Sequence, residues 1–322
     1  MKSRIEVLGH GRKVVEYVFG LFTPIALGLS LLLFSILAPN FLSFANMMNI
    51  LRQVSFVAVL SIGLCVVMIN NDFDLSVAAI MGLSGAICSV MLKLDAPVFS
   101  AIVVSCIAGV FLGLINAFFT VSIGIISILS TLALSYMCSG IELTLLKGTW
   151  VPANAEIFIF LRDGNILGVP TPVMLVVIIF LVYLYFLERT KYGTYMYAIG
   201  GNMQAAIISG INVKLLRYVS FVVAGLSASI ASFLFIARIG GSTPHGGELS
   251  LMDAFLANFV GQSVSRQRVY NVTGTLIGAI FAGILTNGFT LLGVHAFHMY
   301  LIKGVVIIVI VAISTRYKRG VI

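Results

Sequence analysis

Four acidic residues lie within or at the edges of long apolar runs, where an ionised carboxylate is costly: Asp72, Asp74, Glu142 and Asp253. A carboxylate at such a position must face protein, water or lipid headgroups, where it can bind a cation, carry a proton or contact a polar solute. The stretch Asn70–Ser76 interrupts one apolar run and begins the next. Two interpretations stay open there: Asp72 or Asp74 caps the helix that follows, or the broken helix lines a solute pathway.

The sequence contains none of the motifs that carry common enzymatic chemistry. It has no Gly-x-x-x-x-Gly-Lys-Ser/Thr loop for phosphates, no Gly-x-Ser-x-Gly elbow and no His-Glu-x-x-His pair. His295 and His298 are three positions apart but lack a third ligand, so we interpret them as interfacial side chains rather than a zinc site. The four cysteines are widely spaced within apolar runs and are interpreted as small fillers. We therefore expect no enzymatic activity, no cofactor and no metal.

The polar stretch Tyr192–Val213 predicts a short helix whose surface suits a partner. Two glycines are expected to break the backbone, an asparagine to cap the helix and a third glycine to end it. A face of small side chains fits docking into a groove of a soluble protein, although a well-capped loop helix without a partner explains the same pattern. The residues are, in that order, Gly200 and Gly201, Asn202, Gly210 and, on the small face, Ala205, Ala206 and Ser209.

The elements that must position these residues are membrane-spanning helices. Of 322 residues, 60% are hydrophobic and only 9% are charged, whereas a soluble globule needs about a quarter charged. The apolar runs are continuous rather than alternating, which favours helices over a β-barrel. We predict an all-α polytopic protein of about ten spans, of which 252–263 is too short to cross a bilayer unaided. The runs are 17–38, 54–70, 75–92, 97–121, 125–146, 171–187, 218–237, 252–263, 272–292 and 298–314.

The net charge of +8 orients the chain rather than indicating a nucleic-acid partner. With ten spans, a single domain over 1–322 has a cytoplasmic N-terminus (1–16), an external loop (147–170) and a cytoplasmic segment (188–217). Most basic residues then lie on the cytoplasmic side, as the positive-inside rule expects. For the external ones we hold two interpretations open, docking of an acidic partner surface or headgroup anchoring. These external residues are Arg52, Lys147, Arg162 and Arg238.

A weak internal repeat runs through the chain. Its two copies are offset by five predicted helices, an odd number, so the second copy would cross the membrane in the opposite sense, as in many transporters. Two Gly-x-x-x-Gly faces also predict close helix contacts, within one subunit or in a dimer. The echoes are Arg52–Val57 with Arg217–Val222, Asp74–Ser76 with Glu248–Ser250, and Gly113–Thr120 with Gly283–Thr290; the glycine faces are Gly109–Gly113 and Gly274–Gly278.

The cytoplasmic stretch carries a family resemblance. Tyr197–Asn202, followed by Ala205-Ala206 and Ser209–Val213, closely resembles a segment of the permease subunits of ribose-type monosaccharide ABC importers. Asp74–Ser76, Asn116, Gly274–Gly278, Asn287-Gly288 and Ile302–Gly304 match the same family in order, so the likeness spans about 45–314. The resemblance implies an inverted-repeat permease fold in a bacterial inner membrane. It also implies a separate cytoplasmic ATPase, a second permease subunit and a periplasmic or tethered solute-binding protein.

By that resemblance, 200–210 would be the coupling helix that transmits closure of the ATPase. Coupling candidates are Gly200, Gly201, Asn202, Ala205, Ala206 and Gly210; candidates for the translocation pathway are Asp72, Asp74, Ser76, Asn116, Asp253 and Asn287. Two alternatives remain: an ion-coupled secondary transporter that uses the intramembrane acids, or a related permease for amino acids or nucleosides.

Two segments depart from the family pattern. Asn70–Phe73 stands where the family has Gly-Gly, and 261–270 replaces most residues of a glycine-rich run with bulky ones. These departures from the family pattern leave the identity of the transported solute open. They also motivate the hypothesis that the subunit pairs with a different permease rather than with its own copy.

Overall fold

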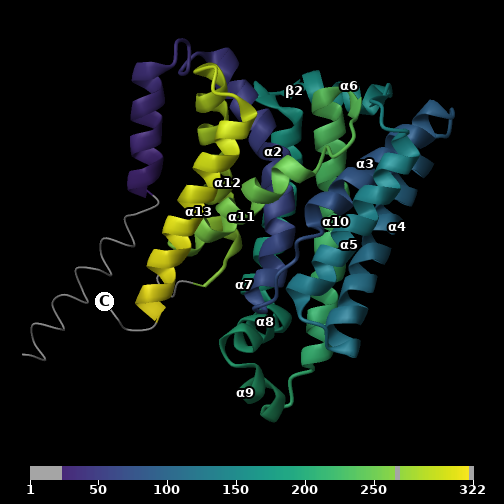
Figure 1. Ribbon diagram of the computed structural model, residues 1–322, viewed down its shortest axis with the longest axis vertical. Helices are drawn as coiled ribbons and strands as arrows, with labels where there is room; N and C mark the ends of the chain where they lie inside the picture. Colours follow the sequence, from purple (N-terminus) through teal and green to yellow (C-terminus); the bar gives the residue numbers. More distant parts are fainter. Residues whose placement is uncertain (1–23, 265–268, 319–322) are drawn as a thin grey trace, which may run out of the picture.

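The computed structural model describes residues 24–264 and 269–318, and helices make up most of them (Figure 1). The predicted segment 1–16 and the start of the run 17–38 lie outside these residues. In chain order the helices are Pro24–Leu37, α2 (Phe44–Ile69), α3 (Val77–Lys93), α4 (Val98–Ala117) continued by the π-helical η1 (Phe118–Ile123), α5 (Ser127–Leu146), α6 (Glu156–Asp163), α7 (Thr171–Arg189), α8 (Lys191–Gly201), α9 (Met203–Ile208), α10 (Val213–Ile239), α11 (Glu248–Gln262), α12 (Val272–Leu291) and α13 (Ala296–Lys318).

Six helices of the described chain are long and apolar enough to cross a bilayer: α2, α4 with η1, α5, α7, α10 and α12. This finding confirms a mostly α-helical, multi-pass membrane protein. Helices suit the hydrocarbon core because they satisfy their own backbone N–H and C=O groups. At 1.5 Å per residue, the 15 residues of α11 reach only ~22 Å, which agrees with the expectation that this segment cannot span alone.

Polar side chains begin several helices where the apolar runs start. Ser43 accepts a hydrogen bond from the Asn46 N–H at 3.3 Å, and Asn212 accepts from the Leu215 N–H at 3.1 Å. Asn271 accepts from the Gly274 N–H at 2.7 Å. These caps satisfy N–H groups that a helix cannot bond internally.

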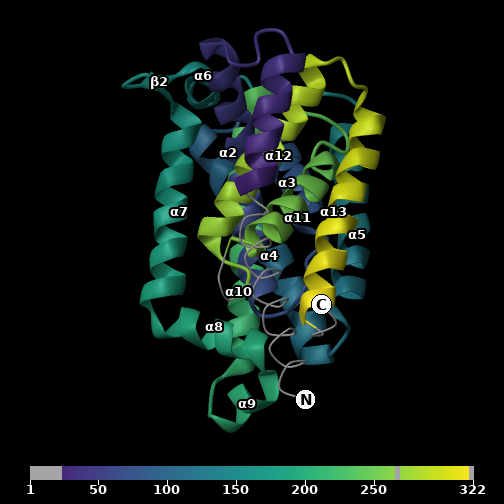
Figure 2. The ribbon, with the colours of Figure 1, turned by 90° about the vertical axis from the view of Figure 1, so that its left-hand side faces the viewer.

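Short helices and strands lie at both ends of the molecule (Figures 1 and 2). Figures 1 and 2 place α6 and β2 at the top and α8 and α9 at the bottom, so the two ends are called here the α6 end and the α9 end. Within the described residues, four two-residue strands add minor β structure to the predicted all-α fold. They form two antiparallel pairs, β1 (Val151–Pro152) with β4 (Gly241–Ser242) and β2 (Asn165–Ile166) with β3 (Val169–Pro170).

Helices α2 and α10 form the centre of the bundle and cross closely where small residues meet. Gly63 of α2 lies against Ser227 of α10, and a Cβ at Gly109 of α4 would overlap the Gly225 carbonyl of α10. Gly274 and Gly278 of α12 pack in the same way on the backbone of α11. Both predicted glycine faces are therefore used for packing within the chain.

Two irregular segments enter the bundle from opposite ends. Residues 70–76 follow α2 near α8, where Gly200 packs on the Ile69 carbonyl. Residues 240–247 follow α10 at the α6 end, where Gly241 pairs with Pro152. Gly247 then meets the backbone of Ala78, so the start of α11 lies against the start of α3.

Candidate functional site

The irregular segment 70–76 is held by side chains at the start of α5. The Phe73 N–H donates to Ser127 Oγ at 3.2 Å, and the Leu75 N–H donates to Thr131 Oγ1 at 3.0 Å. These bonds supply the partners that a broken helix loses, which is the condition for irregular backbone within a membrane protein.

Three of the six pathway candidates form one buried network. Asp74 Oδ1 accepts from the Ser76 N–H at 2.8 Å and from the Ser76 hydroxyl at 2.6 Å. The Asn116 amide of α4 donates to Ser76 Oγ at 2.7 Å. Asp74 thus bonds the residue that precedes α3, as the capping interpretation expects, and all three side chains are fully buried. Their first role is to fix the start of α3.

Asp72 does not cap α3 but forms an ion pair with Arg217, at the start of α10. The guanidinium donates to both carboxylate oxygens, at 2.7 and 2.8 Å, and both side chains are mostly buried. Bidentate geometry is the strong form of this interaction. The pair joins the segment after α2 to α10 at the α9 end.

Asp253 and Asn287 have separate partners elsewhere in the bundle. Asp253 of α11 forms a buried ion pair with Lys303 of α13 at 2.6 Å. Asn287 of α12 and Asn46 of α2 exchange amide hydrogen bonds in both directions, each 2.9 Å long. The structure therefore divides the six pathway candidates among four places.

Glu142 of α5 is buried between helix α3 and the irregular segment 240–247. Its carboxylate lies beside Gly82 of α3 and accepts from the Gly246 N–H. A Cβ at position 82 would press on the carboxylate oxygens. Glycine there leaves room for the acid.

A cavity of about 470 Å³ lies among α2, α10, α11, α12 and α13 toward the α6 end. Asp253 is the one pathway candidate in its wall, and Lys303 lines it too. The other lining residues are Gln53, Phe56, Phe235, Arg238, Ile239, Gly246, Leu249, Ser250, Thr286, Thr290, Val294, Met299 and Tyr300.

The expected coupling segment folds as two helices, with one correction. Gly200 and Gly201 do not break the backbone: they are the last residues of α8, and the chain turns at Asn202. Gly200 is needed instead for close contact, since a Cβ there would overlap the Ile69 carbonyl. Asn202 caps α9 as predicted, accepting from the Ala205 N–H at 3.0 Å, and Gly210 follows with a φ of +78°.

The predicted small face of α9 is partly buried against the rest of the chain and partly exposed. Ala206 is only 3% exposed and packs among apolar residues of α2 and α8, while Ala205 and Ser209 are exposed. Ile208, which the residue pattern did not single out, is 86% exposed. The surface available to a partner is therefore more apolar than the small-residue pattern indicated.

The four basic residues that were predicted to be external have different surroundings. Arg162 hydrogen-bonds the exposed Asp163 and thereby lowers the pKa of that carboxyl. Arg238 is partly buried in the cavity wall, where its guanidinium lies over the Phe56 ring. Lys147 is exposed and Arg52 partly buried. Of these four basic residues, Arg162 and Lys147 are therefore the two that are exposed at the surface.

Sequence reasoning missed the basic partners of the two ion pairs. Arg217 is the first residue of a segment in the second copy of the internal repeat, and Lys303 is the one charged residue in the run 298–314. A lone charge in an apolar run signals a partner, but only the packing identifies it.

The chain resembles known importer permeases over most of its length. Residues 46–311 match the family described as "Branched-chain amino acid transport system / permease component". It is 32% identical to the ribose import permease protein RbsC of Escherichia coli (strain K12), over 91% of this chain and 92% of that protein. It is 33% identical to RbsC of Bacillus subtilis (strain 168), over 88% of each, and 28% identical to the xylose transport system permease protein XylH of E. coli (strain K12), over 87% of each. No solved structure is significantly similar.

Proposed function

Since the chain belongs to the permease-component family of the branched-chain amino acid transport systems, we propose that it is the membrane permease subunit of an ATP-driven importer for a monosaccharide or a similar small polar solute. The observation that carries the proposal is the similarity to ribose and xylose permeases over about nine-tenths of the chain. These relatives confirm the resemblance that the cytoplasmic stretch indicated. The chain itself carries no phosphate-binding loop, in keeping with an ATPase on a separate subunit.

The α9 end is the proposed docking site of that ATPase, on the cytoplasmic side. A capped helix with a highly exposed isoleucine, flanked by Arg189, Lys191 and Lys214, has the shape and charge for this role. The α6 end then faces outward, toward a periplasmic or tethered solute-binding protein. The membrane is the bacterial inner membrane, with both chain ends and 188–217 on the cytoplasmic side.

We further propose ten spans arranged as an inverted repeat. The packing supports this arrangement. In an inverted repeat, α10 would correspond to α2 and α4 to α12, so the contact of α2 with α12 should recur as a contact of α10 with α4. Both contacts are present. The irregular segments before α3 and α11, which enter from opposite ends, are the corresponding parts of the two copies.

A second permease subunit completes the pore. The departures from the family pattern lie near the ion pair of Asp72 and near Gly261, which packs on Gly274. We keep the proposal that the partner is a different permease. Purification from the native host and a count of the distinct permease chains tests it, and a single species would contradict it.

An ion-coupled secondary transporter is less well supported, because Asp72 and Asp253 are already neutralised by Arg217 and Lys303. Reconstitution of the chain with its ATPase and binding protein in proteoliposomes is the direct test. We expect uptake of labelled D-ribose or D-xylose to require ATP. Uptake driven by a proton or sodium gradient without ATP would contradict the proposal, and uptake of amino acids or nucleosides alone would correct the solute.

A further inference from the structure

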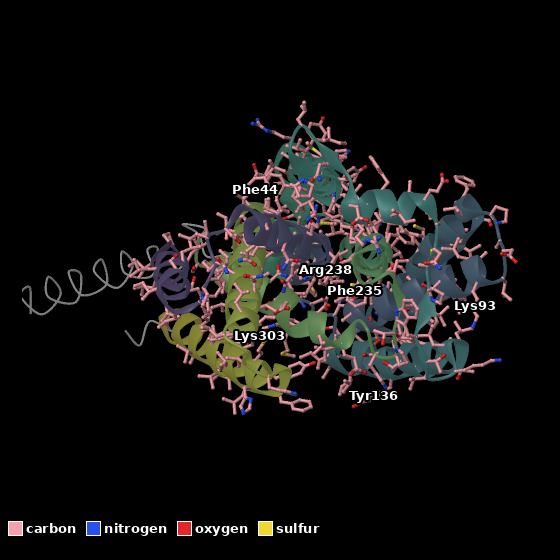
Figure 3. All side chains as sticks on the ribbon, turned by 90° about the horizontal axis from the view of Figure 1, so that it is seen from above. Phe44, Lys93, Tyr136, Phe235, Arg238 and Lys303 are labelled. Carbon is pink, nitrogen blue, oxygen red and sulfur yellow. The ribbon has the colours of Figure 1, made fainter. Side chains whose placement is uncertain are left out.

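The cavity at the α6 end gathers polar and aromatic groups from five helices. Figure 3, seen from the α6 end, shows Phe235, Arg238 and Lys303 toward the middle of the bundle, whereas Lys93 and Tyr136 lie near its edge. A volume of about 470 Å³ falls in the usual range for sites that bind small molecules. One sugar ring with a few water molecules fits such a space.

The polar wall offers both donors and acceptors. The Arg238 guanidinium reaches Gln53 Oε1 only at 3.4 Å, which leaves its other N–H groups available. Asp253 and Lys303 neutralise each other at 2.6 Å but present further oxygen lone pairs and N–H groups. Thr286 and Thr290 add hydroxyls from α12.

Part of the lining is aromatic. The rings of Phe56 and Phe235 meet edge to face at 5.4 Å, and Tyr300 lies in the same lining. The Arg238 guanidinium is 5.9 Å from the centre of the Phe56 ring, which helps to compensate its charge together with the C-terminus of α10. Aromatic rings beside several hydrogen-bonding groups suit a solute with apolar C–H faces and hydroxyl edges.

We propose that this cavity is a binding site for a neutral single-ring polyol on its way through the membrane. The proposal rests on the proposed import function and adds where the solute binds and of what class it is. An amino acid needs a carboxylate for its ammonium group, and the one acid in the lining, Asp253, is already paired with Lys303. The network of Asp74, Ser76 and Asn116 is fully buried and does not line the cavity, so its residues support the bundle and do not contact the solute.

The first test fills the cavity. In the reconstituted complete transporter, Thr286→Trp is expected to lower ATP-driven D-ribose uptake at least ~10-fold, because the indole occupies the solute's space. Leu301→Trp is the matched control: it lies on the neighbouring α13, is 67% exposed and does not line the cavity. The control should transport at the wild-type rate. Wild-type uptake by a properly assembled Thr286→Trp transporter would overturn the proposal.

The second test measures occupancy and does not depend on how Thr286→Trp folds. Thr290→Cys, made in a Cys106→Ala background because Cys106 is the one native cysteine that is not fully buried, places a thiol in the lining. A water-soluble methanethiosulfonate reagent should modify it, and D-ribose or D-xylose should slow the reaction. Equal labelling rates with and without these sugars, or protection only by D-galacturonate, uridine or L-leucine, would overturn the proposal.

The third test removes the charged donor. Arg238→Gln should raise the D-ribose concentration needed for half-maximal protection of the Thr290→Cys thiol by about 10-fold, the loss expected for a charge-assisted hydrogen bond. An unchanged concentration would overturn the assigned contact. The outcomes separate the site from the function. If the wild-type transporter imports D-ribose, but the sugar does not protect the Thr290→Cys thiol and Thr286→Trp does not reduce uptake, the proposed site is wrong and the proposed function stands. If the wild-type transporter imports no sugar, the proposed function itself is wrong.

Discussion

At the scale of single residues, Asp72 and Arg217 are 145 positions apart and yet form a bidentate, mostly buried ion pair. The pair closes the segment after α2 against the start of α10, beside the helices that lead to α9. The pair lies close to the end of α2, on which Gly200 of α8 packs.

Replacing Asp72 with asparagine should destabilise the protein strongly. Arg217 would remain mostly buried without its counter-charge, which costs about 3–5 kcal/mol in comparable pairs. The measurement is the thermal unfolding midpoint in detergent. Asp163→Asn is the control, because the pair that Asp163 forms with Arg162 is exposed and should contribute nothing measurable.

The double variant Asp72→Asn with Arg217→Gln distinguishes two effects: the loss of the attraction between the two charges, and the cost of leaving the Arg217 charge buried without a partner. Removing both charges should recover part of the stability lost by Asp72→Asn alone. Equal midpoints for Asp72→Asn and Asp163→Asn would contradict the structural role of the pair.

At the scale of elements, the crossing of α4 and α10 depends on the absence of side chains. A Cβ at Gly225 would overlap the Gly109 carbonyl, so Gly225→Val should force the two helices apart. We expect little monodisperse protein in detergent. Gly140→Ala in α5 is the matched change, because nothing lies near its Cβ position, and it should be neutral or stabilise the helix by up to about 1 kcal/mol. Normal yields of Gly225→Val would show that the crossing tolerates separation.

Helix α9 presents the second prediction at this scale. Ile208→Asp should prevent co-purification of the ATPase subunit and abolish ATP-driven uptake, because a charge replaces the exposed apolar contact. The fold should stay intact, since Ile208 contacts little of its own chain. Leu167→Asp, at a 97% exposed site in the turn between β2 and β3, is the control and should leave ATPase binding unchanged. Full association of the Ile208→Asp variant would remove α9 from the docking surface.

The same geometry changes the expectation for the small face. Because Ala206 is buried in its own chain, Ala206→Arg should disrupt the fold of α8 and α9 rather than merely block a groove. Gly210→Glu should be strained as well, because position 210 has a positive φ.

At the scale of the whole molecule, the opposite ends of the bundle should face opposite sides of the membrane. Reporter domains inserted near 167 and near 209 test this directly. We expect an alkaline phosphatase insertion to be active only near 167 and a green fluorescent protein insertion to fluoresce only near 209, because basic residues concentrate around α8 and α9. The same compartment for both insertions would contradict an odd number of spans between them.

Much of the architecture follows from the sequence alone. Continuous apolar runs with few charges determine helices and a membrane environment, because only such segments satisfy their backbone in lipid. The caps at Asn202 and Asn212 and the turn at Gly210 follow from local chemistry, which acts over three or four residues. The family was readable in the stretch 197–213 for the same reason: its asparagines and glycines stand at specific positions, whereas the residues of the apolar runs are interchangeable.

Tertiary packing alone decided which polar groups meet. Asp72 could have capped α3, and only the approach of α10 gives it Arg217 instead. Asp253 with Lys303, and Asn287 with Asn46, likewise depend on contacts between helices distant in the chain. A buried polar group must find a partner, but the sequence does not state which helix brings it, because apolar faces of similar shape pack in many ways. The cavity has the same origin, since its walls come from five helices that no local pattern connects.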